Sequence, residues 1–246
     1  MMRVKELINI AKEAQKKDDD TNYIVIGRTR TGKSTFVLHC MEFLGAKDTD
    51  IAMYPEEVAT AIRSAGIEGA WMFDEAIEGI ESKEGQSRFN RELEKLFLIT
   101  AGNKMITFLI IPVYKLVASV FREDIIDGLF YVYARGKVMY YSSKKLKQIH
   151  AYMERHKGKF GGAKPSFKDH FPLYQGYLAK SYQDKKNKKL TDALKSFEDK
   201  VMKQKETIVT KKQQIIELLH KGWTPSNIAK ELKCATTYVS NTKNLS

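Results

Sequence analysis

A glycine-containing loop from Gly27 to Thr35 restricts the fold of this chain more than any other feature of its sequence. The loop reads GRTRTGKST and follows an apolar, β-branched run, Tyr23–Gly27, which predicts a buried strand. Two glycines let the backbone curl until successive N–H groups point at one anion. The helix expected from Lys33 to about Leu44 adds its positive N-terminal end. The spacing G-x-x-x-x-G-K-[ST] therefore predicts a strand–loop–helix unit that holds phosphate groups, and the alternative is a glycine-rich turn without a ligand.

Two side chains of this loop have a specific expected role. Lys33 would reach the β- and γ-phosphates of a nucleotide as a point charge, which makes it an expected catalytic residue as well. The Ser34 hydroxyl would be a ligand of Mg²⁺. The expected nucleotide-binding residues are Gly27, Arg28, Thr29, Arg30, Thr31, Gly32, Lys33, Ser34 and Thr35.

Two adjacent acidic residues follow the apolar segment Ala70–Phe73. We expect Asp74 to hold Mg²⁺ through water, and Glu75 to point to the other side of the strand end, where it could polarise an attacking water molecule. The alternative is an acidic N-cap for a following turn, with Asp74 as the cap. The complete phosphate loop upstream favours the metal and catalytic reading.

Strand-like and helix-like segments alternate along the chain up to residue 142. This alternation predicts an α/β fold with a mainly parallel sheet that helices cover on both faces. After the N-terminal helix, the further expected strands are Ile51–Tyr54, Ala70–Phe73 and Met105–Ile111, and the further expected helices are Pro55–Ala65, Ser87–Thr100 and Lys115–Asp127. A tight hairpin is expected between Leu129–Ala134 and Val138–Tyr141.

The strand–GRTRTGKST–helix unit, the segment AWMFDEA and the helix SRFNRELEKLFLITAGNK leading into MITFLII together resemble a known class. They look like the additional-strand, catalytic-glutamate class of P-loop ATPases. From about Tyr23 to Tyr141 the chain is similar to HerA/FtsK-type DNA motors, which include viral genome-packaging ATPases and phage Zot-like proteins. The resemblance implies ATP and Mg²⁺ as ligands, ATP hydrolysis, a ring-shaped homo-oligomer, and translocation or packaging of DNA. It also implies that Met105–Ile111 lies between the first strand and the strand that ends at Asp74.

The same class commonly has a polar residue after that inserted strand, where it senses the γ-phosphate. This chain has Pro112-Val113-Tyr114 there, and Thr107 lies in the middle of the strand. Motors of the class also use an arginine from a neighbouring subunit to stabilise the charge of the transition state. The candidates for that arginine are Arg88, Arg91, Arg122 and Arg135, and the favoured alternative for each is an ordinary surface cation.

Charge is divided unequally between the two halves of the chain. Residues 1–135 hold 18 Lys/Arg and 21 Asp/Glu, a net charge of −3, and residues 136–246 hold 24 and 9, a net charge of +15. A strongly basic second half favours a polyanionic partner such as DNA. The alternative is a lysine-rich solvated surface of the kind that thermophile proteins show.

The last forty residues predict a helix-turn-helix. Lys211–Leu219 is an amphipathic helix ending near Gly222, and Thr224-Pro225 is a helix start with a cap and a proline at the first position. A second helix, Thr236–Lys243, would enter the major groove, as in resolvases and small regulators, which this segment resembles. Ala235 stands where such units usually have a Ser or Thr cap, so Thr236 is the alternative cap. The expected DNA-binding residues are Thr236, Thr237, Tyr238, Asn241 and Lys243, and the alternative is a three-helix bundle for protein contacts.

These patterns predict four segments: an N-terminal helix (1–20), a P-loop ATPase domain (21–142), a basic connector (143–205) and a helix-turn-helix domain (206–246). Two cysteines without a short spacing exclude a disulfide scaffold and a cysteine-based zinc site, and they suit a reducing cytoplasm. No apolar run approaches the roughly 18 residues that span a bilayer. We expect a cytoplasmic protein of a host cell, with a virus or a mobile element as the candidate source of its gene.

Three functions fit the sequence. The favoured one is a Mg-ATP-hydrolysing motor on DNA, and the second is an ATP-dependent DNA-binding regulator or replication initiator without translocation. The third is a small-molecule kinase, against which the paired acids Asp74 and Glu75 and the C-terminal module both argue.

Overall fold

The computed structural model describes residues 1–17, 19–74, 91, 95, 97, 102–112, 114 and 125–243. The chain divides into two compact units, Met1–Lys186 and Asn187–Ser246. The segment limits expected from the sequence, at residues 142 and 205, stay predictions, because these units are defined by contacts and not by function.

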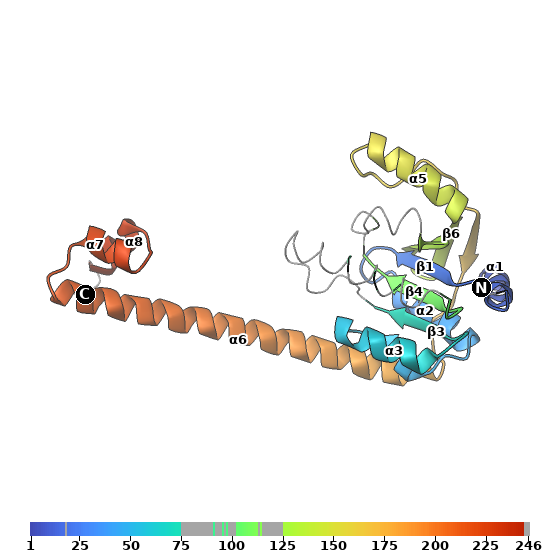
Figure 1. Ribbon diagram of the computed structural model, residues 1–246, viewed down its shortest axis with the longest axis horizontal. Coiled ribbons are helices and arrows are strands. Elements are labelled where there is room, and N and C mark those ends of the chain that lie inside the picture. Colours follow the sequence, from blue (N-terminus) through green and yellow to red (C-terminus); the bar gives the residue numbers. More distant parts are fainter. Residues whose placement is uncertain are drawn as a thin grey trace. The chain divides into compact units, whose positions relative to one another are not determined.

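The described residues of the first unit form one seven-stranded sheet, in the order β2-β3-β4-β1-β5-β6-β7 (Figure 1). Its strands are β1 (Thr21–Ile26), β2 (Ile51–Ala52), β3 (Ala70–Phe73), β4 (Ile106–Ile110), β5 (Gly128–Ala134), β6 (Lys137–Ser142) and β7 (Phe167–His170). Neighbours from β2 to β5 run parallel, whereas β6 is antiparallel to β5 and β7 is antiparallel to β6. The fold is therefore α/β and the sheet mainly parallel, as expected, with β6 and β7 making it a mixed sheet. The tight turn at Gly136, with a φ of 71°, reverses the chain there.

Strand β4 lies between β1 and β3, so the strand order that the resemblance implied is confirmed. Val25 of β1 is paired with Ile110, and Phe73 of β3 is paired with Leu109. The carboxyl ends of these parallel strands consequently meet at one edge of the sheet, which is where α/β folds bind ligands. The loop after β1 and Asp74 after β3 both lie at that edge.

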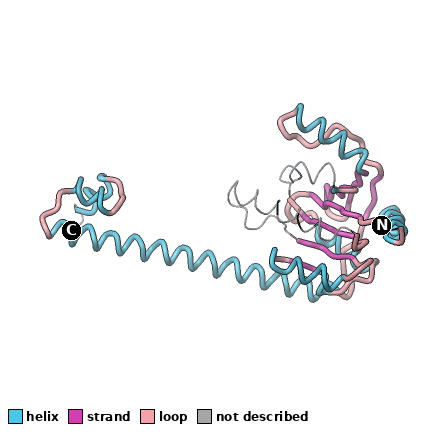
Figure 2. Tube along the Cα trace, viewed as in Figure 1, coloured by secondary structure: helices cyan, strands magenta, loops and turns pink. Residues whose placement is uncertain are grey.

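Helices cover both faces of the sheet, as the alternation of strands and helices predicts (Figure 2). Side chains that alternate along a strand point to opposite faces, and the two hydrophobic clusters follow this rule. Tyr23 and Val25 pack in the cluster with α1 (Met2–Gln15) and α2 (Lys33–Phe43). The intervening Ile24 and Ile26 pack in the cluster with α3 (Val58–Ala65) and α5 (Ser143–Arg155).

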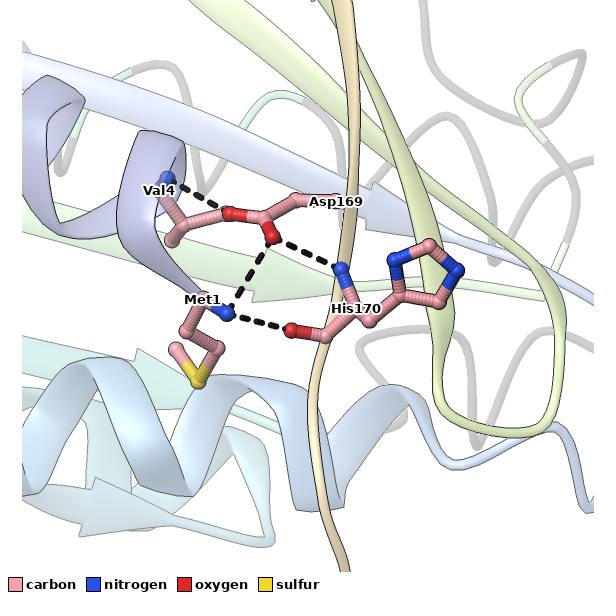
Figure 3. A network of polar contacts seen from close by, with 4 residues as sticks. All are labelled: Met1, Val4, Asp169 and His170. Carbon is pink, nitrogen blue, oxygen red and sulfur yellow. Dashed lines mark hydrogen bonds and ion pairs between the residues drawn. The ribbon is translucent and has the colours of Figure 1, made fainter.

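Asp169 of β7 ties the edge of the sheet to the start of α1 (Figure 3). Its carboxylate accepts a hydrogen bond from the Val4 N–H at 3.0 Å and lies 3.1 Å from the amino group of Met1. The Met1 nitrogen also donates to the His170 carbonyl. Because Met1 supplies no side-chain cap, Asp169 takes the place of an N-cap residue from 165 residues away.

Several elements differ in extent from the sequence expectation. β2 covers only Ile51–Ala52, and the helix expected from Pro55 starts as a 3₁₀ turn, Pro55–Glu57, before α3. β7 was not expected at all, because its sequence, FKDH, has only one apolar residue. The helix expected at Ser87–Thr100 falls outside the described residues except at positions 91, 95 and 97, and most of the one expected at Lys115–Asp127 does too.

The second unit contains most of a long helix and two short ones. The helix expected at Lys211–Leu219 is the end of a much longer helix, α6 (Leu178–His220), and α7 (Pro225–Glu231) and α8 (Thr236–Lys243) follow it. The Thr224 hydroxyl accepts from the Asn227 N–H, so the predicted cap of α7 is confirmed. The buried side chains of this unit's small core are Ile215, Ile228, Ala229 and Val239. Within the described ranges, none of the helices combines the length and the apolar character that a bilayer-spanning segment requires.

Candidate nucleotide-binding site

Gly27 begins the loop between β1 and α2, and only glycine fits there. Its φ is 154°, and a Cβ added to it would lie 2.4 Å from the Val132 carbonyl oxygen of β5. That distance is far inside a van der Waals contact. The first glycine of the motif is therefore required by the close approach of the loop to the neighbouring strand.

The rest of the loop turns the chain into α2. Arg30 has a φ of 65° and Gly32 a φ of 95°, both in the left-handed region. The N-cap position of α2 is Gly32, which has no side chain to bond the first N–H groups of the helix. The amino end of α2 therefore presents N–H groups and a positive dipole end to the edge of the sheet. This is the arrangement that the motif predicts for binding phosphate.

Lys33 folds back over the loop from the first turn of α2. Its Nζ donates to the Gly27 carbonyl at 2.9 Å and to the Arg28 carbonyl at 3.3 Å. Thr31 closes the same turn through its hydroxyl, which donates to the Arg28 carbonyl at 2.8 Å. The ammonium group is thus held at the loop, where a bound phosphate would meet it.

Ser34 and Asp74 are 40 residues apart in sequence and in direct contact. The Ser34 hydroxyl donates to Asp74 Oδ2 at 2.8 Å, and the Tyr182 hydroxyl donates to the same oxygen. The Asp74 N–H donates to the Ala52 carbonyl, which fixes the end of β3 against β2. The two expected metal-side residues, one from the loop and one from the strand end, are therefore brought together.

The chemistry of Asp74 fits a divalent cation. The residue is only 3% exposed, and no Lys or Arg in the described part of the chain forms an ion pair with it. Burying a carboxylate without a cation is costly, so a positive partner would stabilise it. The described residues also contain no cluster of three or more His, Cys, Asp or Glu side chains. Mg²⁺ suits such a site, because it takes one or two protein ligands and completes its shell with water and phosphates.

The remaining predicted site residues are the catalytic glutamate, the candidate arginines and Thr107. Glu75, Arg88 and Arg122 lie outside the described residues. Arg91 and Arg135 are exposed, and Arg135 lies in the β5–β6 turn. Thr107 is buried near the amino end of β4 and is paired with Trp71. Since Asp74 comes three residues after Trp71, about 10 Å along the sheet, Thr107 is too far away to sense a phosphate.

The expected DNA-binding residues are partly exposed. On α8, Thr236, Thr237 and Asn241 are exposed. Tyr238, which would have to be exposed to contact DNA, is half-buried, because its side chain packs against the small core of the unit. The helix begins at Thr236 itself, so Ala235 holds the cap position and the alternative cap at Thr236 is wrong. The Lys243 side chain lies outside the part of the structure that is described.

Tyr182 and Phe171 are the site residues that the sequence did not reveal. Phe171 lies against the loop, and a Cβ on Gly32 would be 3.6 Å from its ring. Both residues come from more than 90 positions after Asp74, in a stretch that carries no motif. A single sequence offers no signal for such long-range contacts.

No protein-family profile matches this sequence, and no curated protein matches it. Among solved structures, the chain is similar to the N-terminal domain of zonular occludens toxin from Neisseria meningitidis. The identity is 11%, the match covers 67% of this chain and 97% of that one, and the TM-score is 0.35. At that TM-score the likeness supports no conclusion about fold or function.

Proposed function

We propose that this chain binds and hydrolyses Mg-ATP at the edge of the sheet formed by the Gly27–Thr35 loop and Asp74. The observation that carries the proposal is the hydrogen bond between Ser34 and Asp74, which joins the phosphate loop to the acidic end of β3. The position of β4 between β1 and β3 supports it, because this order is what the catalytic-glutamate class of P-loop ATPases requires.

Each residue of the site has a separate proposed role in binding or hydrolysing ATP. The N–H groups of the loop and of the α2 end bind the phosphates, and Lys33 adds a charge near the phosphate that is transferred. Ser34 and Asp74 would hold Mg²⁺, the serine directly and the aspartate through water. When bound, Mg²⁺ would neutralise charge that develops on the phosphates. Glu75 follows Asp74 directly and is proposed to accept a proton from the attacking water.

Steady-state ATP hydrolysis by the full chain and by Glu75→Gln tests this function. Glutamine keeps the shape of the side chain but cannot accept the proton, so we expect turnover to fall about 100-fold or more while ATP affinity stays near normal. The exposed Glu56, changed to Gln, is the matched control and should hydrolyse ATP like the parent. Undiminished turnover in Glu75→Gln would place the base elsewhere, and no turnover by the parent would refute the enzymatic function.

We propose further that ATP hydrolysis drives the translocation or packaging of DNA. The protein would work as a homo-oligomeric ring. The supporting observations are the +15 charge of residues 136–246 and the exposed polar residues Thr236, Thr237 and Asn241 on α8. On this proposal α7 and α8 form the helix-turn-helix. The ring and an origin in a virus or mobile element rest on the resemblance, and a cytoplasmic location rests on the two cysteines without a short spacing.

The second candidate is an ATP-dependent DNA-binding regulator or initiator. What favours it is the short α8 that follows a capped α7, the arrangement of a sequence-reading helix. ATP hydrolysis stimulated by DNA of any sequence would support the motor. A sequence-specific footprint together with slow turnover would support the regulator.

A further inference from the structure

The segment from Phe171 to Lys186, here called the strap, runs along α2 and reaches the metal side of the site. The Phe171 ring packs 5.4 Å from that of Phe36, and His39 Nε2 lies 3.0 Å from the Pro172 carbonyl oxygen. Further along, the Tyr177 hydroxyl donates to the Ala46 carbonyl, just after α2. The part of the strap that precedes α6 thus follows α2 from the loop end of that helix to its far end.

The first turns of α6 then dock beside β2 and β3, through Lys185 at the start of β2 and Tyr182 at the residue after β3. Lys185 Nζ donates to the Asp48 carbonyl at 2.6 Å and to the Ile51 carbonyl at 2.8 Å, at the start of β2. Tyr182, one turn earlier, is 6% exposed, and its hydroxyl donates to Asp74 Oδ2. This part of α6 belongs to the same compact unit as the nucleotide-binding site.

The hydrogen bonds that Ser34 and Tyr182 donate to Asp74 leave an oxygen available for a cation on both Ser34 and Asp74. Oδ2 accepts from both Ser34 and Tyr182, whereas no residue in the described part of the chain donates to Oδ1. A serine that donates its proton to Asp74 keeps its oxygen lone pairs for a cation. Ser34 and Tyr182 therefore hold Asp74 Oδ2 in place, and Oδ1 is available to accept a hydrogen bond from metal-bound water.

We propose that Tyr182 is a positioning residue of the nucleotide-binding site, which orients Asp74 for Mg²⁺ and couples Mg-nucleotide binding to the docking of the first turns of α6. The inference rests on the proposed function. The coupling is reciprocal by thermodynamic necessity. If the docked Tyr182 favours Mg²⁺ binding by some factor, then bound Mg²⁺ favours the docked Tyr182 by the same factor. The first turns of α6 would in this way dock more tightly when the site binds Mg-nucleotide and less tightly when it releases it.

Tyr182→Phe in the full chain tests the proposal, because it removes the hydroxyl and keeps the ring. The measured quantity is the affinity for a non-hydrolysable ATP analogue as Mg²⁺ is titrated. We expect the half-saturating Mg²⁺ concentration to rise about 10-fold, the usual cost of losing a residue that orients a metal ligand. Affinity for the analogue with excess EDTA should not change. Tyr177→Phe removes a strap hydroxyl that bonds Ala46 instead and should behave like the parent.

A second readout tests the coupling itself. Amide hydrogen exchange over Leu178–Lys186 should slow in the parent when Mg²⁺ and the analogue are both added, and should slow much less in Tyr182→Phe. An unchanged Mg²⁺ requirement in Tyr182→Phe would overturn the positioning role, and equal losses in both tyrosine variants would assign the effect to the strap as a whole. If the parent itself shows no Mg²⁺-dependent binding, the proposed function fails, and the role of Tyr182 fails with it.

Discussion

At the scale of single residues, Asp169 shows how one carboxylate can hold two distant segments together. Burial raises the pKa of Asp169, but hydrogen bonds from the Val4 and His170 N–H groups and the nearby Met1 amine outweigh burial, so its pKa lies below the usual value. The lowered pKa means that the ionised form favours folding. This contribution is fully present above the unfolded-state pKa of about 3.9 and disappears as the pH falls through the folded-state value.

Asp169→Asn should therefore lower the free energy of unfolding by about 1 kcal/mol at pH 7, because asparagine keeps an acceptor oxygen but loses the charge that strengthens these contacts. The difference between parent and variant should begin to shrink as the pH falls below about 4, and it should vanish below the folded-state pKa of Asp169, where both side chains are uncharged. Urea unfolding at a series of pH values measures this. Asp48→Asn removes an exposed carboxylate as a control. A difference that stays constant with pH would show that the ionised carboxylate is not what matters.

At the scale of the elements, the sequence predicted those that local pattern determines. The strand before Gly27, the helix after it, the β5–β6 hairpin and the cap of α7 all follow from apolar periodicity and from Gly, Pro and Thr at fixed offsets. The two metal-side residues were predictable as well, because Ser34 belongs to a spaced motif and Asp74 follows an apolar strand. β7 and the contact of Tyr182 with Asp74 were not. FKDH has little strand character of its own and pairs only because β6 offers an edge.

The C-terminal helices α7 and α8 carry the element-scale prediction about DNA. Deleting Lys205–Ser246 removes seven lysines and three glutamates, together with the exposed face of α8. We expect most DNA affinity to be lost, and the log–log salt dependence of binding to flatten by roughly 0.9 for each phosphate contact removed. ATP hydrolysis without DNA should persist, which checks that the first unit remains folded. Equal affinity and an equal salt slope after the deletion would instead point to the basic stretch before residue 205.

At the scale of the whole molecule, the two proposed activities lie in the two compact units of the chain, Met1–Lys186 and Asn187–Ser246. The nucleotide-binding site lies in the first unit, whose α/β sheet brings the loop after β1 and the acid after β3 to one edge. The proposed DNA contacts lie in the second unit, which has its own small core. A helix that begins beside Asp74, α6, continues into the second unit without interruption. The proposed motor activity depends on the first unit binding Mg-nucleotide.

The most direct test is the melting temperature of the full chain with and without Mg-ATP. A ligand that binds only the folded state stabilises it by RT ln(1 + [L]/Kd), which is about 2.7 kcal/mol at 100 times Kd. For a domain of this size we predict a rise of several degrees in the parent, about 2–4 °C for each kcal/mol. Lys33→Ala should show none, and Lys47→Ala, which removes an exposed cation, should respond like the parent. An equal rise in Lys33→Ala and the parent, or no rise in the parent, would contradict the account.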